Sequence, residues 1–160
     1  MILRYTRPFM SVLWSDESRF SKWLEVELAV LRILEKEKQV PRGIADSIKK
    51  KAQINVKRIL EIEKQVQHDV IAFNTSIAEQ VGKQGRYFHF GLTSSDVVDT
   101  ALSLLLIQAL HEIRSGMKRL GQVLVSLAIK YKSLPCIGRT HGIHAEPTSF
   151  GLKFLSWFAE

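Results

Sequence analysis

Apolar residues recur at helical spacing through most of the first half of the chain. Apolar side chains three or four positions apart share one face of a helix, so this pattern is typical of amphipathic helices. It predicts one helix that begins near Ser15 and Asp16, whose side chains can cap free backbone N–H groups, and that ends before Pro41. It predicts further helices over residues 44–52, 56–66 and 70–81.

The segments between these helices lack a helical pattern. Residues 1–14 mix polar and aromatic side chains and are expected to be extended or irregular. Asp69 is expected to cap the helix over residues 70–81, and Gly82 to end it, because short acidic side chains favour helix starts and glycine favours helix ends. Residues 83–92 are expected to form a loop.

The longest predicted helix runs from Asp96 to about Tyr131 without a proline. At 1.5 Å per residue it would span about 50 Å. Thr93 and Asp96 have the spacing of a capping box at its start. Its apolar residues cover too wide an arc for a helix on the protein surface, so it is expected to lie inside a helical bundle. A polar loop over residues 138–147 then leads to a last helix with an aromatic stripe.

Together these elements predict an all-α fold. Residues 1–92 would form an N-terminal helical domain, and residues 93–160 would begin a central helical-bundle domain with its first long helix. The last helix reaches Glu160 without a glycine, a cap or a turn signal. We therefore expect the bundle domain to be truncated and the chain to be part of a longer protein.

The net charge of +7 admits nucleic acid, a membrane surface or a small anionic substrate as a partner. The basic residues are dispersed, however, and the densest cluster, Lys49–Lys51, lies within an amphipathic pattern that is typical of a solvated helix face. The sequence has no zinc-finger spacing and no RNP-type aromatic motif. These two observations argue against a nucleic-acid partner, but the charge by itself leaves the kind of partner open.

The number of cysteines and the length of the apolar runs indicate the cellular compartment of the protein. A single cysteine, Cys136, excludes an internal disulfide framework. The first residues lack the long apolar run of a signal peptide. The longest uninterrupted apolar run, Leu104–Ile107, is far shorter than the roughly 20 residues that cross a bilayer. We expect a cytoplasmic protein.

Four polar clusters open or interrupt the predicted helices. An arginine can hold a phosphate or carboxylate through two hydrogen bonds, a helix start attracts anions, and histidine as a residue type suits acid–base chemistry near neutral pH. Each cluster also has a plain structural interpretation, as a surface pair, a helix cap, a packed ring or a turn. The clusters are Arg4-Tyr5, His68-Asp69, Thr93-Ser94-Ser95-Asp96 and Gly138–Pro147, which contains His141 and His144.

The same residue types could in principle bind a metal. Zinc needs three or four ligands, but the sequence has no HExxH motif and only one cysteine. We expect no metal site and no cofactor.

At these clusters the sequence resembles the adenylosuccinate lyases, a branch of the fumarase/aspartase superfamily. Five stretches match in order along the whole chain, and those around His141 point to this branch within the superfamily. The stretches are Arg4-Tyr5, Gln67–Val70, Gly91–Thr100, Gly138–Gly142 and His144–Thr148.

The resemblance implies a fumarase/aspartase-like bundle and an anti β-elimination. The reaction would release fumarate from adenylosuccinate, giving AMP, and from the succinyl-carboxamide intermediate of purine biosynthesis. By this resemblance His141 is the general acid, His68 is a catalytic residue that orients the substrate, and Arg4 and Tyr5 hold the nucleotide phosphate. The rest of the substrate site would be Gln67, Asp69, Thr93 and Ser94.

The resemblance also implies a homotetramer whose active sites are shared between subunits. The general base would be a serine on a flexible loop beyond residue 160, so residues 1–160 alone are expected to be inactive. Members of the family often carry arginine at the position of Gln67, and glutamine here would leave the phosphate more dependent on Arg4. Two alternatives stay open: another superfamily lyase or cycloisomerase, of argininosuccinate or carboxymuconate type, and a basic helical nucleic-acid-binding module.

Overall fold

The computed structural model describes residues 2–160, which form two compact units. The first unit extends to Ala109 and the second comprises Leu110–Glu160. Helix α6 belongs to both, because its first part packs with the N-terminal helices. The division at residues 92 and 93 stays a prediction.

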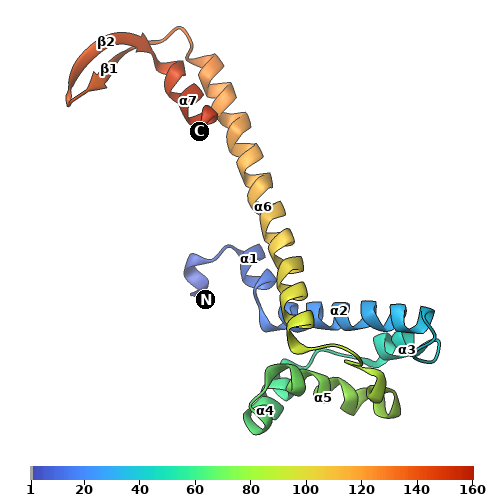
Figure 1. The fold of residues 1–160 in the computed structure, drawn as a ribbon. Helices are drawn as coiled ribbons and strands as arrows, with labels where there is room; N and C mark the ends of the chain where they lie inside the picture. Colours follow the sequence, from blue (N-terminus) through green and yellow to red (C-terminus); the bar gives the residue numbers. More distant parts are fainter. Residues whose placement is uncertain (1) are drawn as a thin grey trace. The chain divides into compact units, whose positions relative to one another are not determined.

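The first unit consists of helices (Figure 1). Four of them, α2 to α5, pack on one another and on the start of α6 through a shared apolar core. In chain order the elements are η1 (Leu3–Tyr5), α1 (Pro8–Leu13), α2 (Asp16–Lys36), α3 (Ile44–Lys51), α4 (Val56–Val66), α5 (Asp69–Val81), η2 (Gly82–Tyr87) and the first part of α6 (Ser94–Lys130).

An aromatic cluster lies at the centre of this core. Phe20 and Trp23 of α2 meet edge to face with ring centroids 5.2 Å apart, and Phe73 of α5 lies 5.5 Å from Trp23 and 5.9 Å from Phe20. All three are buried. Phe88, which follows η2, packs against Phe73. Aromatic side chains bury the largest apolar areas, so this cluster fixes α2, α5 and the segment before α6 against one another.

The structure confirms the four predicted helices, and places them at residues 16–36, 44–51, 56–66 and 69–81. Ser15 caps α2 as predicted, with its Oγ accepting the Ser18 N–H at 3.2 Å. Gly82 ends α5 with a positive φ of 62°, a conformation that glycine adopts without steric cost.

Three local predictions in the first unit are wrong. Residues 1–14 contain η1 and α1, and Pro8 at the first position of α1 explains the helix because its fixed φ suits a helix start. The N-cap of α5 is His68 rather than Asp69. The segment over residues 83–92 begins as the 3-10 helix η2 rather than as a loop.

The second unit contains the rest of α6, a two-stranded antiparallel sheet and helix α7 (Phe150–Ala159). The expectation of a loop over residues 138–147 is therefore wrong. Strands β1 (Pro135–Thr140) and β2 (Ile143–Ser149) form a hairpin with a bulge between Ile137 and Arg139. Apart from this small sheet the fold is helical, as predicted.

Helix α7 returns against the end of α6. Ser149 caps α7 by accepting the Gly151 N–H at 3.2 Å, and the Gly151 N–H also donates to the Tyr131 carbonyl at 3.1 Å. Tyr131 packs edge to face on Phe150, with ring centroids 5.5 Å apart. Over residues 2–160 no helix combines the length and the apolar character needed to cross a membrane.

Candidate active site

Arg4 and Tyr5 lie together on η1 at the start of the chain. The Arg4 guanidinium is stacked over the Tyr5 ring, with Cζ 4.8 Å from the ring centroid. Both side chains are exposed, Tyr5 by 75%. A guanidinium ordered by an aromatic ring and open to solvent can bind a phosphate, which is the role predicted for this pair.

Gln67, His68 and Asp69 form the junction between α4 and α5. Gln67 has a φ of 52°, in the left-handed region that non-glycine residues rarely adopt. Its N–H donates to the Glu63 carbonyl at 2.8 Å and completes the last turn of α4, while its left-handed backbone ends the helix. This sharp turn lets α5 begin two residues later and presents all three predicted side chains at its N-terminus.

The His68 ring takes part in capping α5. Its Nδ1 accepts the Ile71 N–H at 3.4 Å and lies 3.5 Å from Asp69 Oδ1, which accepts the Val70 N–H at 2.7 Å. With Nδ1 as the acceptor, a neutral ring carries its proton on Nε2. The cap therefore makes Nε2, on the far side of the exposed ring from the α5 N–H group, a hydrogen-bond donor.

Thr93 and Ser94 lie at the N-terminus of α6. Asp96 reaches back so that its Oδ2 accepts the Thr93 N–H at 2.8 Å, which is the carboxylate half of the predicted capping box. This hydrogen bond already uses the Thr93 N–H. Thr93 can then offer a substrate its hydroxyl rather than its N–H.

An apolar cavity of about 260 Å³ joins Asp69 to the first turns of α6. Arg19 is held there by Asp16, with Nη2 to Oδ1 at 3.1 Å, and stacks over the Phe20 ring. The cavity brings one predicted site residue, Asp69, next to residues that the sequence analysis did not assign to a site. Its lining residues are Trp14, Ser15, Arg19, Trp23, Asp69, Val98, Leu102 and Leu105.

His141 occupies the tip of the hairpin in the second unit. Thr140 and Ile143 are paired on either side of a two-residue turn, in which His141 and Gly142 have φ values of 51° and 76°. Two consecutive positive φ values define the type I′ turn, whose twist matches that of the strands. The turn holds the His141 side chain exposed at the apex.

His144 differs from His141 in its setting. It lies within β2, opposite Arg139 of β1. The two histidines therefore have different settings in the hairpin: His141 lies in the turn, and His144 lies in a paired strand.

The sequence analysis missed a hydrogen-bonded contact between Glu27 of α2, which is buried, and His89, which is half-buried. His89 Nδ1 lies 2.6 Å from Glu27 Oε1, and the His89 N–H donates to Glu27 Oε2 at 3.0 Å. Glu27 is only 1% exposed, and this burial raises the pKa of its carboxyl above the ordinary value even though His89 opposes the shift. The sequence offered one indication of this contact: Glu27 lies on the apolar face of α2, and a buried acid requires a hydrogen-bonding partner.

A metal site requires several ligating side chains close together. Within residues 2–160, no group of three or more histidine, cysteine, aspartate or glutamate side chains is arranged to hold a metal ion.

Comparison with known proteins assigns the chain to a family. A family model described as "Lyase" matches residues 3–160. The chain belongs to this lyase family. An adenylosuccinate lyase of Thermotoga maritima is 47% identical over 160 residues, which are 100% of this chain and 37% of that protein. This member of the lyase family therefore spans little more than a third of the length of its curated relatives.

Two solved structures have the same fold over nearly the whole chain. A fumarate lyase from Mesorhizobium sp. BNC1 superposes with a TM-score of 0.88 at 28% identity, over 97% of this chain and 38% of that one. A 3-carboxy-cis,cis-muconate lactonizing enzyme from Pseudomonas putida superposes with a TM-score of 0.85 at 28% identity, over 96% of this chain and 37% of that one. The fold class predicted from the sequence, a fumarase/aspartase-like helical fold, is confirmed.

Proposed function

We propose that the full-length protein containing this chain is an adenylosuccinate lyase. It cleaves adenylosuccinate to AMP and fumarate, and the succinyl-carboxamide intermediate of purine biosynthesis to its carboxamide and fumarate. The observation that carries the proposal is the identity of 47% to an adenylosuccinate lyase along the whole chain. The muconate lactonizing enzyme shares 28% over nearly the same residues, which favours the adenylosuccinate branch over a cycloisomerase.

The reaction proposed is an anti β-elimination with general acid–base catalysis. A base removes the proton from the carbon beside a substrate carboxylate, and His141 protonates the nitrogen that leaves. The exposed position of His141 at the apex of a two-residue turn supports this role, because a proton donor must be able to reach the substrate.

The remaining predicted residues bind and orient the substrate in this proposal. Arg4, stacked on Tyr5, holds the phosphate. His68 donates from Nε2 to the substrate while its Nδ1 stays engaged in the α5 cap. The positive ends of α5 and α6 favour carboxylates, whose oxygens gain charge in the carbanion-like transition state. The side chains at these two helix starts are those of Gln67, Asp69, Thr93 and Ser94.

The proposal includes a homotetramer that works in the cytoplasm, with active sites shared between subunits. Several apolar side chains of α6 and α7 in the second unit are exposed, among them Met117 at 68% and Trp157 at 58%. Exposed apolar surface of this kind is typical of an interface or a bundle. The general base is a serine outside this chain, so residues 1–160 alone are inactive.

The test is a steady-state assay of the full-length protein with three substrates. Adenylosuccinate should be cleaved with an absorbance change, whereas argininosuccinate and 3-carboxy-cis,cis-muconate should not react. Turnover of either of the other two in place of adenylosuccinate would overturn the proposal. A chain without lyase activity that binds DNA or RNA in a strongly salt-dependent manner would favour the nucleic-acid-binding alternative.

A further inference from the structure

Glu27 is a buried acid on an otherwise apolar helix face. Trp23 precedes it by one turn and Leu31 follows by one turn, and both are buried. A hydrophobic residue would fit this face, and replacing buried ionic groups by apolar ones is often neutral or stabilising. A carboxylate at this position is therefore expected to make specific hydrogen bonds through its two oxygens.

Both oxygens of Glu27 hold one residue, His89. Oε1 contacts the ring Nδ1 at 2.6 Å and Oε2 accepts the backbone N–H at 3.0 Å. His89 has a φ of 62°, so the chain turns sharply at this point. Because the carboxylate binds the backbone and the ring together, it fixes both the position and the orientation of the turn.

The turn at His89 leads directly to the start of α6. Phe88 on one side is buried against Phe73. On the other side the Leu92 N–H donates to the His89 carbonyl at 3.4 Å, and Thr93 follows. A short segment anchored at Phe88 and His89 thus determines where α6 begins.

We propose that Glu27 is a positioning residue: by holding His89, it sets the place and direction in which Thr93 and Ser94 are presented to the substrate. This inference rests on the proposed function, in which these two residues bind substrate. Glu27 itself is buried and contributes through His89 alone.

The test uses two substitutions of Glu27 in the full-length enzyme. In Glu27→Leu the side chain stays similar in size but becomes apolar, so His89 loses both acceptors. In Glu27→Gln one amide oxygen can still accept the His89 N–H, and the amide NH₂ can donate to Nδ1 after a change of His89 tautomer. We expect KM for adenylosuccinate to rise at least tenfold in Glu27→Leu with a smaller change in kcat, and Glu27→Gln to restore KM to within about threefold of wild type.

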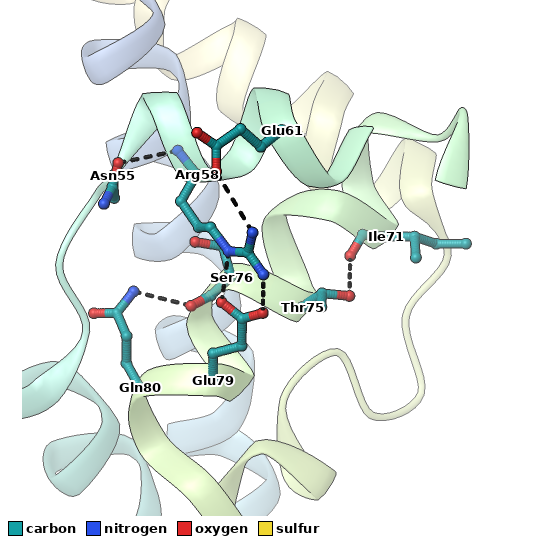
Figure 2. A network of polar contacts seen from close by, with 8 residues as sticks. All are labelled: Asn55, Arg58, Glu61, Ile71, Thr75, Ser76, Glu79 and Gln80. Atoms are coloured by element: carbon teal, nitrogen blue, oxygen red, sulfur yellow. Dashed lines mark hydrogen bonds and ion pairs between the residues drawn. The ribbon is translucent and has the colours of Figure 1, made fainter. Parts of the chain in front are cut away.

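Glu79→Gln is the matched control. It removes one acceptor of a different interhelical pair, with Arg58, on the surface between α4 and α5 (Figure 2). This control should lower thermal stability without changing KM. An equal rise of KM in Glu79→Gln and Glu27→Leu would mean that general destabilisation is the cause and would overturn the inference.

His89→Asn serves as a second variant in case Glu27→Leu does not fold. Asparagine tolerates a positive φ, keeps the backbone N–H and removes the ring contact. KM should rise in His89→Asn, and amide hydrogen exchange over residues 89–95 should be faster than in wild type and in Glu79→Gln. Unchanged KM together with unchanged exchange would overturn the inference. A wild-type enzyme that does not cleave adenylosuccinate would instead overturn the proposed function, while the exchange data would still decide whether Glu27 fixes this segment.

Discussion

Arg58 and Glu79 join α4 to α5 through two hydrogen bonds, from Nε to Oε2 at 3.0 Å and from Nη2 to Oε1 at 2.6 Å (Figure 2). Asn55 caps the same end of α4 by accepting the Arg58 N–H at 3.0 Å. The two-pronged geometry fixes the rotation of one helix against the other more strictly than a single ion pair does. The hydrogen bonds with Arg58 hold the pKa of the Glu79 carboxyl below its ordinary value.

Glu79→Gln should make the stability of the protein less dependent on acid pH. The folded-state pKa of Glu79 lies below the ordinary value of 4.5, so its stabilising contribution is present above that pH and is lost as pH falls through the folded pKa. We expect the variant to melt at a lower temperature than wild type near neutral pH. The difference should shrink towards zero well below pH 4.5, as measured by circular dichroism melting at several pH values. A difference in melting temperature between the two proteins that grows as the pH falls would contradict this prediction.

Gly151→Ala should destabilise the contact between α7 and α6. A Cβ on Gly151 would lie 2.5 Å from the Ala128 carbonyl oxygen and 2.9 Å from the Lys132 Cα. Both are backbone atoms, so α7 must move away, at a cost of about 1–3 kcal/mol. The free energy of unfolding from urea titration measures this cost.

Gly116→Ala provides the control for that substitution. Gly116 lies within α6, and the nearest atom to a Cβ added there would be the flexible end of Arg119 at 3.8 Å. Alanine at this position should stabilise the helix by about 0.5–1 kcal/mol, because glycine loses more backbone freedom on folding. Equal destabilisation by both variants would mean that replacing a helical glycine is harmful at either position, rather than that Gly151 marks a close approach of α7 to α6.

Helical periodicity was sufficient to predict most of the first unit. Phe20, Leu28 and Leu31 recur at helical spacing and are buried along α2. The prediction failed where a single local interaction decides the structure. Asp69 is a good cap by residue type, but the positive φ of Gln67 begins α5 one residue earlier and puts His68 in the capping position.

The hairpin could not be predicted from the glycines alone. Gly138 and Gly142 disfavour a helix over this segment, but glycines do not distinguish a loop from a pair of strands. The decisive feature is the His141-Gly142 turn between Thr140 and Ile143, which closes a type I′ hairpin. Asparagine or aspartate before glycine is the usual signal for this turn, and histidine is a weaker one.

The candidate site residues stay a prediction, and a buried contact close to them was not predicted at all. The motifs singled out Gln67 and His141, and both adopt positive φ values, a form of backbone strain that often accompanies function. The partnership of Glu27 with His89 joins residues 62 positions apart. No local pattern can predict such a contact, because it depends on how α2 packs against the segment before α6.

His68→Ala should reduce both stability and substrate binding, and His68→Asn should separate the two effects. Removing the ring deletes the acceptor for the Ile71 N–H and should cost about 1 kcal/mol. Asparagine can restore the cap but not the Nε2 donor. We therefore expect His68→Asn to recover the melting temperature while KM for adenylosuccinate stays raised. Recovery of KM together with stability would mean that His68 acts only as a cap.

His141→Asn should abolish most of the activity without disturbing the hairpin. Asparagine favours the positive φ that position 141 requires, but it cannot transfer a proton. Loss of a general acid lowers rates by about 10²–10⁴-fold, so kcat should fall by that factor while the melting temperature and the oligomer size by light scattering stay unchanged. His144→Asn, on the neighbouring strand, is the control and should alter kcat by less than about tenfold. Equal losses in the two variants, or dissociation of the oligomer in His141→Asn, would assign His141 a structural role instead of proton transfer.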